Sequence, residues 1–202
     1  SDRDGSPSIY VMDVTGNNVH QLISETGWDF GPTWSPDGTR IAFSSDRDGD
    51  DNIYVLDMIS GSVLQLTHDP ASDSQPSWSP DSSQIAYVSN RDGDLDIYVM
   101  AANAGDVHQL THDPAWDWNP VWSPDGMWIA FDSNRGGDGD IYIMNPDSGN
   151  VQRLTYTPGE DFQPAWSPDG TQIVFASNRG DRRDSDIYIM DADGRNIWPL
   201  TD

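Results

Sequence analysis

A repeat of 44 residues runs through the whole chain and restricts its fold more than any other feature. The tetrapeptide Trp-Ser-Pro-Asp returns at this spacing, starting at Trp34, Trp78, Trp122 and Trp166. Self-similarity at a period of about 40 to 50 residues is typical of propellers and solenoids. The chain is therefore expected to be an array of one small unit rather than a domain built around a single core.

Each repeat contains four short strand candidates, which we name A to D in chain order. Strand A ends at Trp34, and Ser-Pro-Asp-Gly over 35–38 predicts a tight turn because Pro presets φ and Gly accepts a positive φ. Strands B, C and D are expected over 41–43, 53–56 and 63–66, which are rich in β-branched and aromatic residues. Four antiparallel strands make one propeller blade. We therefore expect an all-β propeller whose stability comes from the stacking of neighbouring blades.

The repeat boundaries predict four complete blades and one half-blade. Residues 1–23 hold only a C–D hairpin, and the complete blades are expected over 24–68, 69–112, 113–156 and 157–202. Since the last blade has its own strand D, the usual closure, in which both termini share one blade, is not available. Three interpretations stay open: a segment of a longer propeller, an open or five-unit ring, and an assembly in which the half-blade edge meets another copy.

Several short motifs recur across the whole chain. They are Ser-Asp-Arg-Asp-Gly (45–49), Ile-Tyr-Val-Met-Asp (9–13), Leu-Thr, Pro-x-Trp-Ser-Pro-Asp-Gly and Ile-Ala-Phe (41–43). This pattern resembles the repeat of the TolB-like, or WD-repeat-like, propeller family. The resemblance implies a scaffold that binds protein partners through the propeller faces and tunnel. It also implies a place outside the cytoplasm: periplasmic, secreted or at the cell surface. Nothing in the chain corresponds to the separate N-terminal domain of the family's namesake.

The chain is strongly acidic, with 34 acidic and 10 basic residues and a net charge of −24. Nearly all of the acid is Asp, which favours turns, so the charge is expected in loops. A field of this sign repels nucleic-acid phosphates and anionic headgroups, which argues against DNA, RNA and membrane-surface binding. No apolar run approaches the roughly 20 residues of a membrane span, so membrane insertion is not expected. Without cysteine, disulfides and thiol catalysis are excluded.

A first set of Asp residues stands in the D–A loops, five residues before each repeated Trp. Because successive strands run in opposite directions, the D–A and B–C loops are expected on the same face, with this Asp set near the central tunnel. Aromatic residues surround it, and together they predict a binding face for a basic peptide or a sugar. Packing of the aromatics between blades is the alternative. The residues are Asp29, Asp73, Asp117 and Asp161, with Trp28, Phe30, Trp116, Trp118 and Phe162.

A second acidic set occupies the B–C loops, where Asp and Asn alternate around a Gly. Ca²⁺ takes six to eight oxygen ligands, so these loops are candidate calcium sites, although no EF-hand Glu follows them. If calcium binds, Ca²⁺ should raise the melting temperature and EDTA should lower it, whereas identical melts would remove the hypothesis. The candidate ligands are Asp46, Asp48, Asp50, Asn52, Asp92, Asp94, Asp96, Asp138 and Asp140.

Ordinary turn chemistry is the alternative to calcium in these loops. Each loop contains one Arg, which would pair with the D–A loop Asp of the same blade, 18 residues earlier. One Arg per repeat cannot neutralise three or four carboxylates, which keeps calcium open. The arginines are Arg47, Arg91, Arg135 and Arg179.

No catalytic constellation is expected. The four histidines follow no single repeat position, and the chain has no Gly-x-Ser-x-Gly elbow, phosphate-cradling loop or metalloprotease helix motif. The sequence therefore predicts a non-catalytic binding scaffold, with a protein partner or self-association through the half-blade edge. Two alternatives stay open: a self-assembling extracellular structural protein, and an accessory propeller domain of a larger enzyme.

Overall fold

The computed structural model describes residues 7–23, 26–147, 149–180 and 185–201. Its strands form four sheets of four strands and one sheet of two strands. The expected all-β fold of four-stranded antiparallel blades is confirmed. In these residues no helix is long and apolar enough to cross a membrane. The first Asp-loop copy over residues 2–6 and the insertion at Arg182 and Arg183 lie outside the described residues.

In every complete blade the strands pair in chain order, and each sheet lies within one of the expected blade ranges. The half-blade is β1 (Tyr10–Val11) and β2 (His20–Gln21). Blade 1 is β3 (Asp29–Trp34), β4 (Arg40–Ser45), β5 (Asn52–Asp57) and β6 (Val63–Gln65). Blade 2 is β7 (Asp73–Trp78), β8 (Gln84–Ser89), β9 (Asp96–Ala101) and β10 (His108–Gln109). Blade 3 is β11 (Asp117–Trp122), β12 (Ile129–Ser133), β13 (Asp140–Met144) and β14 (Val151–Arg153), and blade 4 is β15 (Asp161–Trp166), β16 (Gln172–Ser177), β17 (Asp186–Asp191) and β18 (Trp198–Pro199).

The A–B turn follows from its sequence. In blade 1 the N–H of Gly38 donates to the carbonyl oxygen of Ser35 at 2.8 Å, and Gly38 has a φ of 71°. The carboxylate of Asp37 accepts hydrogen bonds from the Ser35 hydroxyl (2.6 Å) and the Thr39 N–H (2.9 Å). These bonds lower the pKa of Asp37 to about 2. Asp in these turns therefore serves local structure.

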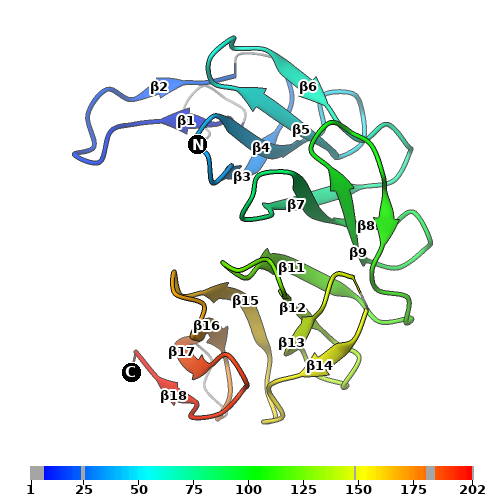
Figure 1. The fold of residues 1–202 in the computed structure, drawn as a ribbon, viewed down its shortest axis with the longest axis vertical. Helices are drawn as coiled ribbons and strands as arrows, with labels where there is room; N and C mark the ends of the chain where they lie inside the picture. The colour runs from blue at the N-terminus through cyan, green and yellow to red at the C-terminus, as the bar shows by residue number, and fades with distance from the viewer. Residues whose placement is uncertain (1–6, 24–25, 148, 181–184, 202) are drawn as a thin grey trace.

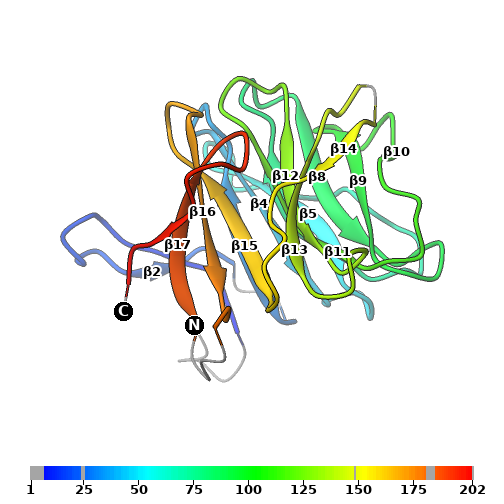
Figure 2. The same ribbon diagram turned by 90° about the horizontal axis from the view of Figure 1, so that it is seen from below.

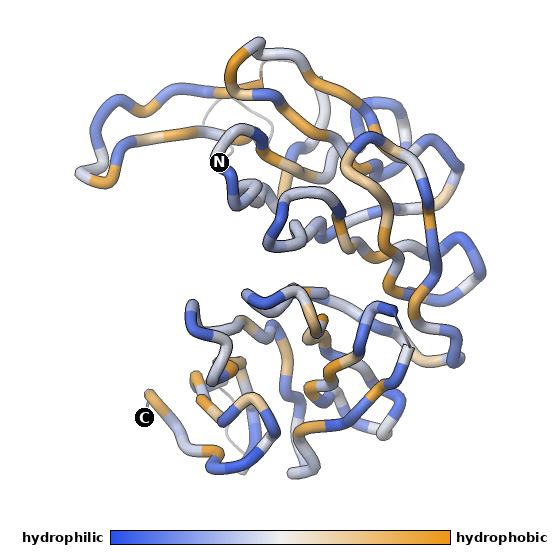
Figure 3. The backbone as a smooth tube through the Cα atoms, in the orientation of Figure 1, coloured by the Kyte–Doolittle hydropathy of each residue, from blue (hydrophilic) through white to orange (hydrophobic). Residues whose placement is uncertain are grey.

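The core lies between blades rather than within one blade. Ala42, Ile53 and Val55 of blade 1 pack against Trp78 and Ile85 of blade 2, and the same cluster type recurs at the following junctions. Each buried side chain of this kind contributes roughly 1.5 to 3 kcal/mol to stability. Hydrophobic residues accordingly lie mainly along the strands and hydrophilic ones in the loops (Figure 3).

A Trp at the end of strand A links some neighbouring blades. The indole N–H of Trp78 donates to the carbonyl oxygen of Thr33 at 3.2 Å, and that of Trp166 donates to Val121 at 3.2 Å. Trp122 holds the equivalent position between blades 2 and 3, and its indole N–H has no acceptor among the described residues. The junctions are therefore similar in packing but unequal in hydrogen bonding.

The sheets follow one another along an arc, with the β1–β2 hairpin at one end and blade 4 at the other (Figure 1). The strands run between two loop-bearing faces (Figure 2). One face carries the A–B and C–D turns, which are joined by bonds such as Met58 N–H to the Thr39 oxygen at 2.9 Å. The opposite face carries the B–C and D–A loops, and we call it the loop face.

Candidate functional site

The loop face is held together by hydrogen bonds from a backbone N–H to a side-chain oxygen that repeat in every complete blade. The first residue of each B–C loop accepts a hydrogen bond from the N–H of the residue before the D–A loop Asp, at 2.6 Å for Asp46 with Trp28 and 2.9 Å for Asn134 with Trp116. Between consecutive complete blades, the B–C loop also holds the next blade; for example, the Asp117 N–H donates to the Leu95 oxygen at 2.8 Å. The two acidic loop sets therefore meet on one face, as the strand directions predict.

The D–A loop Asp residues are interior groups paired with arginine. Arg135 contacts both carboxylate oxygens of Asp117, at 2.8 and 2.7 Å, and the same pairing recurs in the other three complete blades. The predicted Asp–Arg pairing over 18 residues is confirmed. The carboxylates are at most 1% exposed, so the expectation that they line a binding face is wrong: they are buried as partners of the guanidinium. They are Asp29, Asp73, Asp117 and Asp161.

Aromatic rings hold each of these arginines in place. The Cζ atom of Arg135 lies 5.3 Å from the ring centre of Phe131 and 5.0 Å from that of Tyr142. The equivalent Phe or Tyr residues flank the arginine in every complete blade. Burial raises the pKa of Asp117 although Ser133 and Arg135 both act to lower it. The buried Asp–Arg pair and the two rings beside it therefore stabilise the fold of each complete blade.

The candidate calcium ligands divide between several partners. Asp48 and Asp92 each accept a hydrogen bond from a Tyr hydroxyl, at 2.6 and 2.5 Å. Asp96 and Asp140 are buried and accept bonds from Thr hydroxyls, and Asn52 accepts one from Thr67 at 3.1 Å. Among the described residues no group of three or more His, Asp or Glu side chains is placed to hold a metal ion. Calcium binding stays a prediction from the sequence. The same is true of the role of calcium ligand for Asp46, Asp50, Asp94 and Asp138.

Three aromatic side chains of the predicted set are exposed on the loop face. Trp28 is 61% exposed, Trp116 52% and Phe30 37%. Trp116 and Trp118 form an edge-on pair with ring centres 5.6 Å apart, and Trp118 is half-buried. Single exposed apolar side chains are common on soluble proteins, but aromatic residues are enriched where protein partners bind.

Acidic residues occur in the two loops that meet near Trp116. The bond from Asp117 to the Leu95 oxygen places the turn around Asp92 and Asp94 of blade 2 beside Trp116, and Asp92 is exposed. In the D–A loop that carries Trp116, Asp113 is 35% exposed and forms an ion pair with Arg135 at 2.9 Å. Trp116 is therefore an exposed aromatic side chain in a part of the loop face that also carries acidic residues.

Asp132 is a buried acidic residue that sequence reasoning missed. Its Oδ1 atom accepts hydrogen bonds from the Asn119 side chain at 2.8 Å and from the Gln163 N–H at 3.0 Å, so it bridges blades 3 and 4. Burial raises the pKa of Asp132 to about 6. The signal was in the sequence, because this position of strand B is Ser44, Val88 or Ala176 in the other blades.

Together these features define the class of the protein: an array of four-stranded antiparallel β-propeller blades, each with a buried Asp–Arg pair. The chain belongs to the TolB beta propeller domain family, whose model matches residues 1–77 and 65–202. No curated protein matches the sequence.

Solved structures agree with the family. TolB from Acinetobacter baumannii is 27% identical with a TM-score of 0.86, covering 96% of this chain and 48% of that one, so the chain spans about half of that protein. A putative TolB from Agrobacterium tumefaciens is 30% identical with a TM-score of 0.82, covering 96% of this chain and 74% of that one. An oligogalacturonate lyase in complex with manganese is 18% identical with a TM-score of 0.74, covering 99% and 60%, and its likeness concerns the fold alone.

Proposed function

We propose that the chain is a non-catalytic interaction scaffold that binds a basic peptide segment of a partner protein on the loop face, outside the cytoplasm. The exposed Trp116 platform, in a part of the loop face that also has acidic residues, carries this proposal. A Lys or Arg side chain over a Trp ring gains about 0.5 to 2 kcal/mol, and neighbouring carboxylates add attraction at long range. The net charge of −24 favours a partner of opposite sign.

The repeat supplies a matched substitution for a binding test. The repeat position of Trp116 is occupied by Ser72 in blade 2 and by Glu160 in blade 4. In all three, the backbone N–H donates a hydrogen bond to the side-chain oxygen of the Asn that begins the B–C loop. Trp116→Ser therefore removes the platform while it keeps a residue that this site of the fold accepts. Stability should change little.

We expect the chain to bind a fluorescein-labelled peptide of alternating Arg and Gly at physiological salt, and Trp116→Ser to weaken binding about tenfold, which corresponds to about 1.4 kcal/mol. Fluorescence anisotropy measures both. The control is Met127→Ser, which removes a side chain 57% exposed at an A–B turn on the opposite face. Equal affinity of Trp116→Ser and the control would contradict the proposal.

We also propose that partners associate through the edge of the half-blade. Strand β1 pairs only with β2 in the sheets formed by the described residues, and an uncovered strand edge is a template for pairing. This second surface lies at one end of the arc, and it does not depend on the aromatic platform.

A further inference from the structure

At the junction of blades 1 and 2, an arginine covers the Trp that ends strand A of blade 2. The Cζ atom of Arg40 lies 4.6 Å from the ring centre of Trp78, and its Nη2 atom donates a hydrogen bond to the carbonyl oxygen of Ser82 at 2.7 Å. The same nitrogen lies 3.7 Å from the carboxylate of Asp37. These contacts hold the guanidinium on the face that carries the A–B turns, which we call the turn face.

The next junction, between blades 2 and 3, keeps the groups that surround this arginine. At the repeat spacing of 44 residues, a Trp ring, a carboxylate and a turn carbonyl recur. They belong to Trp122, Asp81 and Gly126. Gly126 and Ser82 have φ values of 72° and 61°, so the two turns share their backbone conformation. The arginine is replaced by Gln84, whose side chain is shorter and uncharged.

A pocket of about 240 Å³ lies at the junction of blades 2 and 3. Its lining includes the Trp, the Gln and residues of both A–B turns, namely Asp81, Gln84, Trp122, Asp125 and Gly126. Trp122 is half-buried, whereas Trp78, which lies under Arg40, is 5% exposed. The Gly126 oxygen accepts no hydrogen bond from a described residue. The pocket therefore offers an accessible ring and a carbonyl acceptor where blade 1 places a guanidinium.

Two carboxylates beside the pocket carry negative charge that no cation balances. Asp81 and Asp125 are exposed, and neither forms an ion pair with a described residue. Hydrogen bonds from neighbouring Ser hydroxyl and backbone N–H groups lower the pKa of both carboxyl groups. Both are therefore ionised at neutral pH, and their charge favours a cation in the pocket.

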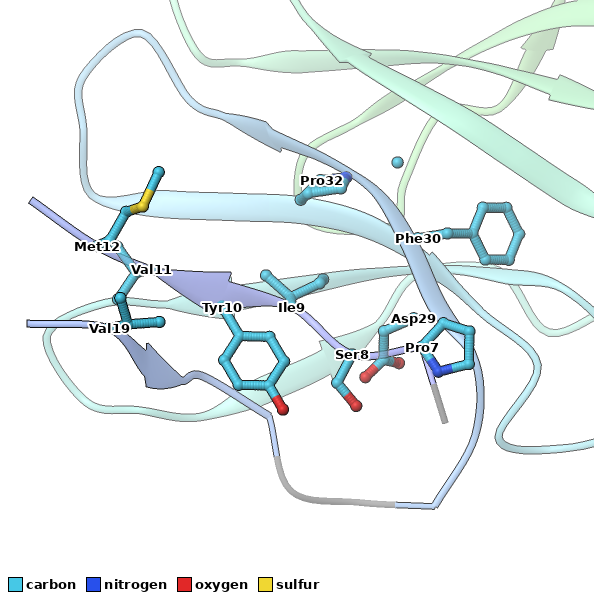
Figure 4. Close-up of a pocket in the computed structure, with 11 residues that line it drawn as sticks. Pro7, Ser8, Ile9, Tyr10, Val11, Met12, Val19, Asp29, Phe30 and Pro32 are labelled. Carbon is cyan, nitrogen blue, oxygen red and sulfur yellow. The ribbon is translucent and has the colours of Figure 1, made fainter. Parts of the chain in front are cut away.

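The shape of this pocket is set by described residues alone, because blades 2 and 3 are both complete. A larger groove of about 540 Å³ at the half-blade, lined by Ile9, Val11 and Phe30, differs in this respect (Figure 4). Its lining begins at Pro7, the first described residue, so the described chain does not fix what covers it.

We propose that the pocket between blades 2 and 3 binds the guanidinium group of an arginine side chain from a peptide segment of a partner protein. The bound guanidinium lies over Trp122 as that of Arg40 lies over Trp78, and it donates to the Gly126 oxygen. Trp is the ring that attracts cations most strongly. Arginine fits better than lysine, because its planar group stacks on a ring and donates to a carbonyl at the same time.

NMR of the ¹⁵N-labelled chain tests this site, because each Trp gives its own indole N–H signal. We expect the tripeptide Gly-Arg-Gly, blocked at both ends, to shift the Trp122 signal saturably at millimolar concentrations. The same peptide with Lys should bind at least about threefold more weakly, and the one with Gln should cause no shift. Trp122→Phe identifies the signal by its loss.

Gln84→Arg fills the pocket from within the chain. Its guanidinium should cover Trp122 in the way that Arg40 covers Trp78, so the Trp122 signal should shift in the free variant and no longer respond to the peptide. The matched control is Gln172→Arg, which places the same charge at the same repeat position of blade 4. That variant should respond like the parent chain.

Asp125→Asn is a second variant that leaves the fold unchanged. The amide oxygen can still accept the bonds that Oδ1 accepts from the Ser123 hydroxyl and the Met127 N–H, at 2.5 and 3.0 Å, while the charge is lost. Binding of the Arg peptide should weaken about threefold. Asp169→Asn, which changes the equivalent turn of blade 4, should have no effect.

No shift of the Trp122 signal with the Arg peptide, equal shifts with the Arg and Gln peptides, or equal responses of Gln84→Arg and Gln172→Arg would overturn the inference. Trp116→Ser separates this site from the one proposed on the loop face. It should leave the response of the Trp122 signal unchanged, because Trp116 lies on the opposite face. If Trp116 is needed for binding and the Trp122 signal does not respond, the loop-face proposal stands and the turn-face pocket fails.

Discussion

Arg135→Ala is expected to lower the free energy of unfolding by about 3 to 5 kcal/mol at pH 8, because it leaves a buried carboxylate without its partner. The guanidinium contacts both oxygens of Asp117, whose side chain is fully buried, and stacks near Phe131 and Tyr142. Chemical denaturation followed by tryptophan fluorescence measures the change.

The loss should be smaller at pH 5 than at pH 8. Burial already raises the pKa of Asp117, and without Arg135 it rises further, so the carboxyl takes up a proton as the pH falls and the buried charge disappears. Arg195→Ala is the control, since Arg195 is 81% exposed and pairs with an exposed Asp193. That variant should stay within about 0.5 kcal/mol of the parent chain. If both variants lowered the free energy of unfolding equally, the buried Asp117–Arg135 pair would not stabilise the blade as inferred.

Asp132→Asn is expected to stabilise the chain at pH 7.5 by up to about 3 kcal/mol, because a rise of about two pKa units costs 1.36 kcal/mol per unit. The amide oxygen can keep both bonds that Oδ1 accepts, from Asn119 and Gln163. The folded pKa of about 6 lies above the ordinary Asp pKa of 3.8. The stability that Asp132 contributes is therefore present below about pH 4 and is lost as the pH rises through 6.

The gain from Asp132→Asn should accordingly shrink when unfolding is measured at pH 4.5. Asp147→Asn is the control, because Asp147 is exposed in a C–D turn. Its stability should follow that of the parent chain at both pH values. A gain from Asp132→Asn that is constant between pH 4.5 and 7.5 would contradict the assigned cause.

The blades could be predicted from the sequence because their signals are local and repeated. Pro and Gly fix the A–B turn at residues 35–38, and apolar runs such as 53–56 form the central strands. The order of the strands then follows from chain direction alone. The Asp–Arg pairs were also predictable, because a constant separation of 18 residues within a known blade places the two groups on one face.

Burial of the D–A loop Asp could not be predicted in the same way. A carboxylate in a loop is exposed in most proteins, and only the three-dimensional packing shows that Asp117 points inward to Arg135 while the preceding Trp116 points outward. Asp132 was missed because it stands within a strand whose other copies are apolar or small. Both errors concern whether one side chain points to water or to the interior. The repeated sequence pattern alone does not determine this direction.

The unequal Trp bonds between blades do not leave one junction unsupported. Trp78 and Trp166 tie their blades to the preceding ones, whereas the indole N–H of Trp122 has no acceptor in the described residues. The junction between blades 2 and 3 is held by other bonds instead: the Asn119 N–H donates to the side-chain oxygen of Gln75 at 2.8 Å, and the Asp117 N–H donates to the Leu95 oxygen at 2.8 Å. No junction between the complete blades therefore depends on the indole bond alone.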